Sequence, residues 1–267
     1  MPTSHQDRLL HEQSDAVEII AHTDTGRQRS RNEDSFYVLS RGSLAVVADG
    51  MGGHADGNIA SSTAVTTICE LVEDKAGPPP FDAREAQFEW LRGMVDEANA
   101  RIFGKNRGYF SVEGMGTTLV MLHLTPRHAI TVCVGDSRIY RYRAGKLRQL
   151  TQDHSLFEEL RRFNLFGGRS AHALNINKNI ITRALGMNSS VNADIEVFPR
   201  KDGDIYLLCS DGLTDLVEDD EIAAILQKSH GDLEKASFEL VATANANGGT
   251  DNITVVLARR LDPSTGS

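Results

Sequence analysis

Hydrophobic and polar positions follow two different periods along the chain, and the change from one to the other separates strands from helices. Short apolar runs bounded by polar residues or glycine are typical of strands. Where two runs are joined by a link as short as Arg41-Gly42, the strands must pair antiparallel. The runs predict strands at 17–22, 35–39, 43–49, 119–124, 129–134, 138–143, 146–150, 195–198, 204–209 and 253–258.

Apolar residues at helical spacing predict four longer helices, each with one buried stripe. A shorter helix is indicated by Leu156, Leu160 and Phe163. The first two long helices are separated by a proline-rich connector at 77–80, and we expect them to pair and lie on a sheet. The four longer helices are predicted at 57–73, 83–103, 219–228 and 233–246.

The runs between 119 and 150 are apolar at most positions and do not alternate cleanly. We interpret them as a meander of four strands in a sheet that is covered on both faces, because a sheet with one wet face alternates. A second sheet packed on the first, with helices outside, satisfies this pattern. The predicted fold class is α+β, a four-layer α-β-β-α sandwich of two packed, mainly antiparallel sheets flanked by helices.

Chain length and the distribution of apolar segments indicate one domain. The 267 residues are enough for a sizeable core. We expect a single domain at 16–260, after a polar, mobile lead-in at 1–15 and before a tail at 261–267. The N-terminal stretch has no apolar segment of the signal-peptide type, and no run approaches the roughly 18 apolar residues of a membrane span. A soluble cytoplasmic protein with no membrane partner is therefore expected.

Charge and cysteine usage narrow the function classes further. With 37 acidic against 28 basic residues the formal net charge is −9, so nucleic acid, which requires a basic face, is not an expected partner. Cys69, Cys133 and Cys209 lie inside apolar runs. An odd number of cysteines in such settings is typical of small buried side chains in a reducing compartment, not of a disulfide framework.

Four aspartates lie at the ends of apolar runs: Asp49, Asp136, Asp211 and Asp251. Each is flanked by glycine, serine or asparagine, so each taken singly fits an Asx-turn or a helix N-cap. At one edge of a sandwich, however, four like charges would be strongly destabilising without a cation between them. An all-oxygen ligand set, with His54 as the one nearby histidine, favours magnesium or manganese over zinc.

The glycine-rich turn after Asp49 matches two nucleotide-binding patterns in part. Gly50, Gly52 and Ala55 fit a dinucleotide fingerprint, but the later strands are hairpin-linked and no second βαβ step follows. A phosphate-binding P-loop requires a lysine and a serine or threonine after the glycines, and these are missing here. We therefore reject both patterns.

Eight motifs, arranged in order from residue 29 to residue 254, resemble the bacterial branch of the metal-dependent protein phosphatases (PPM, type 2C). Several matches in one order are far more specific than any single match. The resemblance covers nearly the whole chain and implies a β-sandwich flanked by helices, in agreement with the periodicity. The motifs are Arg29-x-x-Asn32-Glu33-Asp34, Ala48-Asp49-Gly50-Met51-Gly52-Gly53-His54, Gly114-Met115-Gly116-Thr117-Thr118, Val134-Gly135-Asp136-Ser137-Arg138, Leu150-Thr151-x-Asp153-His154-Ser155, Ile181-Thr182-Arg183-Ala184-Leu185-Gly186, Cys209-Ser210-Asp211-Gly212-Leu213-Thr214-Asp215 and Gly249-Thr250-Asp251-Asn252-Ile253-Thr254.

The resemblance implies a site for two manganese or magnesium ions. Asp49 would bridge the ions, and Asp211 and Asp251 would complete the ligands of one of them. The other ion would be held by the Gly50 carbonyl and, through water, by Asp34 or Glu33. Asp136 matches the family's ligand for a third ion. A hydroxide bridging the pair would attack phosphorus in line, without a covalent enzyme intermediate.

Three arginines in the first motif region are candidates to clamp the phosphate, a role that suits a bidentate guanidinium. They are Arg27, Arg29 and Arg31. The family's spacing selects Arg29, four residues before Glu33, and the other two fit solvated surface arginines.

His54 is a candidate general acid for the leaving group. Eukaryotic relatives place a histidine directly after the Asp-Gly pair, where this chain has Met51, and His54 lies three residues further on. A histidine at a helix start or in the core, with metal-bound water as the proton donor, is the alternative.

The sequence thus predicts a metal-dependent serine/threonine protein phosphatase. The resemblance implies phosphoserine and phosphothreonine proteins as substrates and a serine/threonine kinase that shares these targets. Within the segment 155–181, residues 163–178 correspond to the family's flap beside the site. A catalytically silent binding protein on the same fold is disfavoured because every expected metal-facing acid is present. An enzyme for small phosphoesters remains open, and comparing phosphopeptides with sugar phosphates would separate the two.

Overall fold

The computed structural model describes residues 8–14, 17–41, 43–52, 56–73, 78–80, 83–106, 114–163 and 180–261. The strands are β1 (Arg8–Gln13), β2 (Val17–Asp24), β3 (Asp34–Leu39), β4 (Leu44–Met51), β5 (Gly116–Thr117), β6 (Leu119–Leu124), β7 (His128–Val134), β8 (Arg138–Arg143), β9 (Lys146–Gln149), β10 (Asp194–Pro199), β11 (Ile205–Cys209) and β12 (Ile253–Arg260). The helices are α1 (Asp56–Glu73), α2 (Arg84–Asn106), α3 (Leu156–Arg162), α4 (Asp211–Thr214), α5 (Asp219–Lys228) and α6 (Leu233–Ala246).

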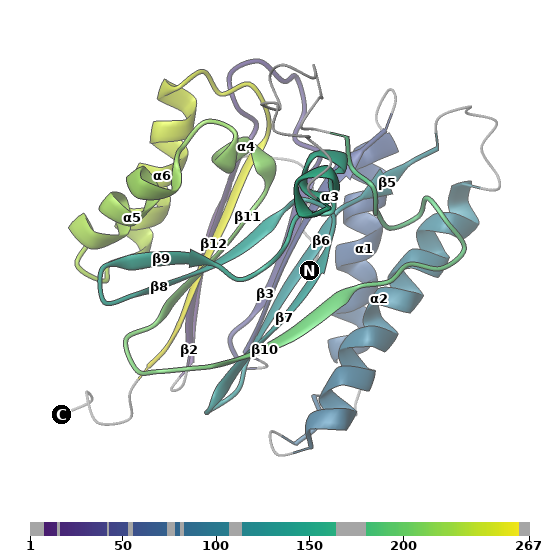
Figure 1. The fold of residues 1–267 in the computed structure, drawn as a ribbon, viewed down its shortest axis with the longest axis horizontal. Coiled ribbons are helices and arrows are strands. Elements are labelled where there is room, and N and C mark those ends of the chain that lie inside the picture. Colours follow the sequence, from purple (N-terminus) through teal and green to yellow (C-terminus); the bar gives the residue numbers. More distant parts are fainter. Residues whose placement is uncertain are drawn as a thin grey trace.

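Two antiparallel sheets form the centre of the molecule. One sheet has the strand order β1-β2-β12-β11-β8-β9 and the other has the order β10-β7-β6-β4-β3, with the short β5 paired to β4. Figure 1 shows α5 and α6 on the outer side of the first sheet and α1 and α2 on the outer side of the second. The predicted four-layer α-β-β-α sandwich is confirmed.

Three apolar cores hold the four layers together. One fills the space between the sheets, one lies between the second sheet and the helices α1 and α2, and one lies between the first sheet and the helices α5 and α6. The inner strands are buried on both faces for this reason, as all six residues of β6 are. The inter-sheet core includes Val47, Val120, Leu122, Ile139, Tyr206 and Val256.

The predicted meander of four strands between 119 and 150 is wrong in one respect. β6 and β7 pair in one sheet, whereas β8 and β9 pair in the other. The chain crosses between the sheets at the turn before Arg138, where Gly135 has a φ of 102°. Apolar runs on both sides of a tight turn predict a hairpin, and nothing local shows that this turn leads to the second sheet.

The predicted mobile lead-in at 1–15 is also corrected, because Arg8–Gln13 forms the edge strand β1 on β2. The segment is polar overall, but Leu9 packs against the core beneath α5 and α6, and Leu10 packs against the inter-sheet core. Successive side chains of a strand point to opposite faces, so the two leucines reach two different cores.

The predictions for the cysteines and the short helix agree with the structure. The three cysteines are free and buried, as predicted. No helix in the described part of the chain is both long and apolar enough to cross a membrane. The predicted short helix is α3, which begins at the N-cap Ser155. Most of the predicted flap at 163–178, the tail beyond 261 and His54 lie outside the described residues.

Candidate active site

Five aspartates meet at one end of the sandwich, which we call the acidic end; they are Asp34, Asp49, Asp136, Asp211 and Asp251. The strand register brings the first two together, because Asp34 opens β3 and pairs directly with Asp49 on β4. The antiparallel hairpin of these two strands therefore aligns both carboxylates at the same edge. Sequence reasoning placed Asp34 in the site but did not predict this pairing.

The other three aspartates come from the connections between strands. Asp136 lies in the turn between β7 and β8, Asp211 is the first residue of α4, and Asp251 lies two residues before β12. The start of α4 packs tightly on the last of these, since a Cβ atom at Gly212 would lie 2.0 Å from the Asn252 carbonyl oxygen. Only glycine permits this approach, which keeps Asp211 close to Asp251.

Asp34 is the most enclosed of the five carboxylates. Its Oδ2 accepts hydrogen bonds from Ser210 Oγ at 2.8 Å and from Thr254 Oγ1 at 2.6 Å. Its Oδ1 is buried and has no hydrogen-bond partner. Burial, opposed by these two hydrogen bonds, raises the pKa of Asp34 to about 6. Sequence reasoning gave neither hydroxyl a role, although both residues lie inside the motifs quoted above.

Three further aspartates, Asp49, Asp211 and Asp136, have raised pKa values. Burial raises the pKa of Asp49 well above its ordinary value, and repulsion from the four other aspartates raises it further. Burial, followed by repulsion from Asp136 and Asp251, raises the pKa of Asp211 to about 8. For Asp136, burial and then the charge of Asp153 raise the pKa to about 6.

Backbone hydrogen bonds hold Asp49 in this unfavourable field. Its N–H donates to Thr118 Oγ1 at 3.0 Å, and its carbonyl accepts from the Thr118 N–H at 2.9 Å and from Thr117 Oγ1 at 2.8 Å. Thr118 Oγ1 also lies 2.7 Å from Ser137 Oγ, beside Asp136. The threonine pair therefore links β4 to the turn that carries Asp136.

Glu33 lies beside the Gly50 carbonyl. A Cβ atom added at Gly57, in the first turn of α1, would lie 2.5 Å from Glu33 Oε2 and 2.7 Å from the Gly50 carbonyl oxygen. Burial raises the pKa of Glu33. Gly57 thus leaves room for two oxygens that face the same space, and sequence reasoning missed it because a helix-starting glycine has several ordinary uses.

The three candidate arginines take different positions. Arg29 Nη2 donates to Asp251 Oδ2 at 2.6 Å, and its side chain is 53% exposed. The Arg27 N–H instead donates to the Gly249 carbonyl, and the Arg31 carbonyl accepts from Asn252 Nδ2. Arg29 is therefore the one of the three whose guanidinium is bonded to an aspartate of the acidic end.

His154, which lies in a quoted motif without an assigned role, anchors the turn that carries Asp136. Its Nδ1 accepts from the Gly135 N–H at 3.1 Å, and its own N–H donates to the Gly135 carbonyl at 2.8 Å. The ring proton is therefore on Nε2, which lies 3.1 Å from Asp194 Oδ2. His154 ties the turn to β10.

The chemistry of the acidic end fits a hard cation. The buried Oδ1 atoms of Asp34, Asp136 and Asp211 have no partner, and the ligand set is all oxygen. Among the described residues, however, no three acidic, histidine or cysteine side chains already stand in the arrangement that would hold one ion. A cation would both neutralise the repulsion and draw these oxygens together.

Comparison with known proteins shows the family of this chain. The family model described as protein phosphatase 2C matches residues 23–247. The chain belongs to the protein phosphatase 2C family. With serine/threonine phosphatases among its relatives, the chain is a phosphoprotein phosphatase, as the sequence predicted.

Relatives and solved structures of the protein phosphatase 2C family match over nearly their whole length. The serine/threonine phosphatase stp of Listeria welshimeri is 39% identical over 241 residues, which cover 89% of this chain and 94% of that protein. The protein phosphatase PhpP of Streptococcus pneumoniae is 38% identical, covering 90% and 96%. The catalytic domain of the serine/threonine protein phosphatase PstP, solved in complex with two manganese ions, has a TM-score of 0.79 at 34% identity, covering 92% and 99%.

Proposed function

We propose that this phosphatase hydrolyses phosphoserine and phosphothreonine in proteins, using two manganese or magnesium ions at the acidic end. The observation that carries the proposal is the convergence of five aspartates, three of which, Asp34, Asp136 and Asp211, have a buried oxygen without a partner. The manganese-bound PstP structure and the serine/threonine phosphatases among the relatives support the metal and the substrate class.

The carboxylates divide between the two ions according to their positions. Asp49, which is repelled by all four other aspartates, would bridge the pair. Asp211 and Asp251, held together by the contact at Gly212, would hold one ion. The other ion would lie in the space that the Gly50 carbonyl faces, with Glu33 or Asp34 reaching it through water. Asp136 would hold a third ion.

When bound, the ions would lower the pKa of a bridging water and neutralise the phosphoryl oxygens. The chain's own residues would orient the substrate. Arg29 would leave its ion pair with Asp251 and bind two oxygens of the phosphate instead. Its side chain is about half exposed, so it can turn toward a bound substrate. Ser210 and Thr254 would keep Asp34 ionised by continuing to donate to Oδ2.

The target proteins would also be substrates of a serine/threonine kinase, since a phosphatase of this class requires a supplier of its substrate. His54 is retained as a candidate proton donor to the leaving group, with metal-bound water as the alternative.

Phosphate release tests the proposal. The enzyme stripped with EDTA should be inactive on a phosphothreonine peptide, and added manganese should restore turnover. Glucose 6-phosphate should be hydrolysed far more slowly under the same conditions. Full turnover by the stripped enzyme would contradict the metal mechanism, and faster hydrolysis of the sugar phosphate would make small phosphoesters the substrate class.

A further inference from the structure

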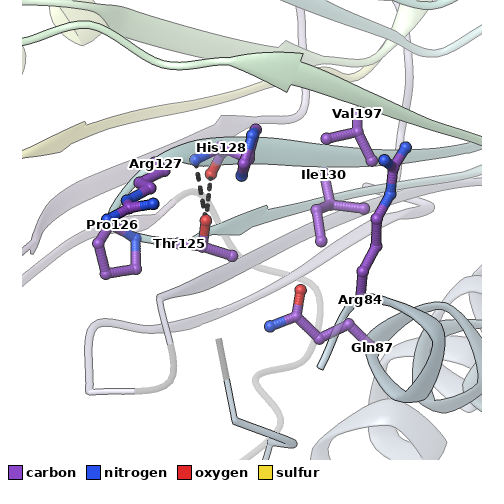
Figure 2. A pocket seen from close by; sticks show the side chains of 8 residues that line it. All are labelled: Arg84, Gln87, Thr125, Pro126, Arg127, His128, Ile130 and Val197. Atoms are coloured by element: carbon purple, nitrogen blue, oxygen red, sulfur yellow. Dashed lines mark hydrogen bonds between the residues drawn. The ribbon is translucent and has the colours of Figure 1, made fainter. Parts of the chain in front are cut away.

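Figure 2 shows a pocket of about 530 Å³ from close by. It lies against the β6–β7 turn, at the end of β7 opposite the acidic end. Its volume is in the range of ligand-binding pockets. β7 runs from the pocket at His128 to Val134, just before Asp136, and its seven residues place the two regions roughly 20 Å apart. The pocket is therefore separate from the site of phosphate hydrolysis. Its lining residues are Arg84, Gln87, Thr125, Pro126, Arg127, His128, Ile130 and Val197.

The wall formed by the β6–β7 turn is rigid. Thr125 Oγ1 accepts from the His128 N–H at 2.9 Å and donates to the His128 carbonyl at 3.0 Å, and the Thr125 N–H donates to the same carbonyl. From outside, Arg200 Nη2 donates to the Pro126 carbonyl at 2.9 Å. This wall is thus held in place before a ligand binds, which reduces the entropy lost on binding.

The charge of the pocket is opposite to that of the molecule. The chain carries a net charge of −9, yet the described lining includes two arginines and no acidic residue. Arg84 is steadied by the ring of Phe88, whose centroid lies 5.4 Å from the guanidinium carbon. Ile130 and Val197 form an apolar wall next to it, as Figure 2 shows. An anionic ligand with an apolar group fits this combination.

Gln87 adds a hydrogen-bond acceptor. Its side chain belongs to a residue that is only 2% exposed, and its Nε2 donates to the Pro80 carbonyl at 3.0 Å. Figure 2 shows its oxygen directed into the pocket. This oxygen can accept a hydrogen bond, so a ligand that brings an N–H group is complementary to it.

We propose that this pocket docks an acidic, extended peptide segment of the phosphoprotein substrate, outside the phosphorylated residue. Glutamate or aspartate side chains bind Arg84 and Arg127, an apolar side chain packs on Ile130 and Val197, and a peptide N–H donates to Gln87. A peptide supplies all three groups at the spacing of consecutive residues. The identification of the partner as a substrate rests on the proposed function. The binding of an acidic peptide to the pocket does not depend on it.

Binding is tested with a fluorescein-labelled decapeptide of alternating glutamate and leucine without phosphate, followed by fluorescence anisotropy. The wild type should bind it, more weakly at high salt. Arg84→Glu/Arg127→Glu should weaken binding by about tenfold or more. The matched control, Arg92→Glu/Arg148→Glu, changes the net charge equally at exposed positions and should bind like the wild type. No binding by the wild type, or equal loss in both variants, would contradict the proposal.

Turnover separates docking from catalysis. Joining the decapeptide through a flexible linker to a phosphothreonine peptide should lower KM for the wild type and the control variant, but not for Arg84→Glu/Arg127→Glu. The short phosphothreonine peptide should be hydrolysed equally by all three. If the short peptide is not hydrolysed by the wild type, the proposed function fails, and the anisotropy result still decides the docking site. If the linked peptide has the same KM in all three, docking of substrates is wrong.

Discussion

Arg29 shows how a single residue can serve two states of the site. In the structure its guanidinium offsets the charge of Asp251 at 2.6 Å. A bound cation would take over that neutralisation, so Arg29 would be released to the phosphate of the substrate. For Arg27 and Arg31 the structure shows backbone hydrogen bonds to Gly249 and Asn252, and no guanidinium bond to an aspartate of the acidic end among the described residues.

We therefore predict that Arg29→Ala raises KM for a phosphothreonine peptide by about tenfold, the loss of one strong charge-assisted interaction. Arg29→Lys should recover only part of the effect, because an ammonium cannot bind the phosphate in bidentate fashion. Steady-state kinetics at saturating manganese measure this. Arg27→Ala and Arg31→Ala are the controls and should change KM much less. If Arg31→Ala is the most damaging of the three, Arg29 is not the clamp.

At the scale of the elements, the turn between β7 and β8 is held by His154, a residue that comes later in the chain, after β9. His154 binds both the N–H and the carbonyl of Gly135, and its ring reaches Asp194 on β10. The position of Asp136 thus rests on contacts from two later segments of the chain.

His154→Ala should lower kcat on the phosphothreonine peptide severalfold even well below the melting temperature, because the turn that carries Asp136 loses its anchor. Ser155→Ala is the matched control. It removes the N-cap of α3, which accepts from the Glu158 N–H, and should reduce the free energy of unfolding by about 1 kcal/mol without this loss of kcat. Unchanged kcat in His154→Ala would show that the anchor is purely structural.

Elements whose apolar residues recur at a clear period could be predicted from the sequence. Elements whose position depends on partners distant in the sequence could not. Residues 219–228 and 233–246 are helices with the predicted bounds, because their apolar stripes are local. β1 was missed because its stability comes from the free edge of β2. The crossing at Gly135 was missed because a tight turn looks the same within one sheet and between two.

The residues of the site fall into the same two groups, those recognisable from the local sequence and those that depend on distant partners. Four of the aspartates could be picked out because each follows or precedes an apolar run, and Asp34 came from the family resemblance; all five meet at one end. Ser210 and Thr254 were missed because they reach Asp34 across more than 170 positions of sequence. Gly57 was missed because its use depends on where Glu33 and Gly50 lie.

At the scale of the whole molecule, the acidic end opposes folding when no cation is present. Burial raises the pKa values of Asp34 and Asp136 to about 6 and of Asp211 to about 8. Between the ordinary aspartate pKa and these values the folded chain binds more protons than the unfolded chain. The contribution to stability is therefore complete at low pH and is lost as the pH rises through about 6 to 8.

In EDTA, the melting temperature should accordingly fall between pH 5 and pH 8. The melting temperature of Asp211→Asn should fall less over this pH range, because the substitution removes the carboxyl with the highest of these pKa values. Asp202→Asn, at an exposed position, is the control and should follow the wild type. Differential scanning calorimetry measures all three. A melting temperature that rises over this range would contradict the repulsion described here.

The central claim is that the acidic end is a centre for manganese or magnesium ions bridged by Asp49, and manganese binding tests it most directly. Isothermal titration calorimetry of the EDTA-stripped wild type should show about two manganese ions per chain in the tighter phase. Asp49→Asn should stay folded, with an unchanged or higher melting temperature in EDTA, and lose this phase. Asp202→Asn should bind like the wild type. The account is contradicted if the wild type binds no manganese, or if Asp49→Asn binds both ions as tightly as the wild type does.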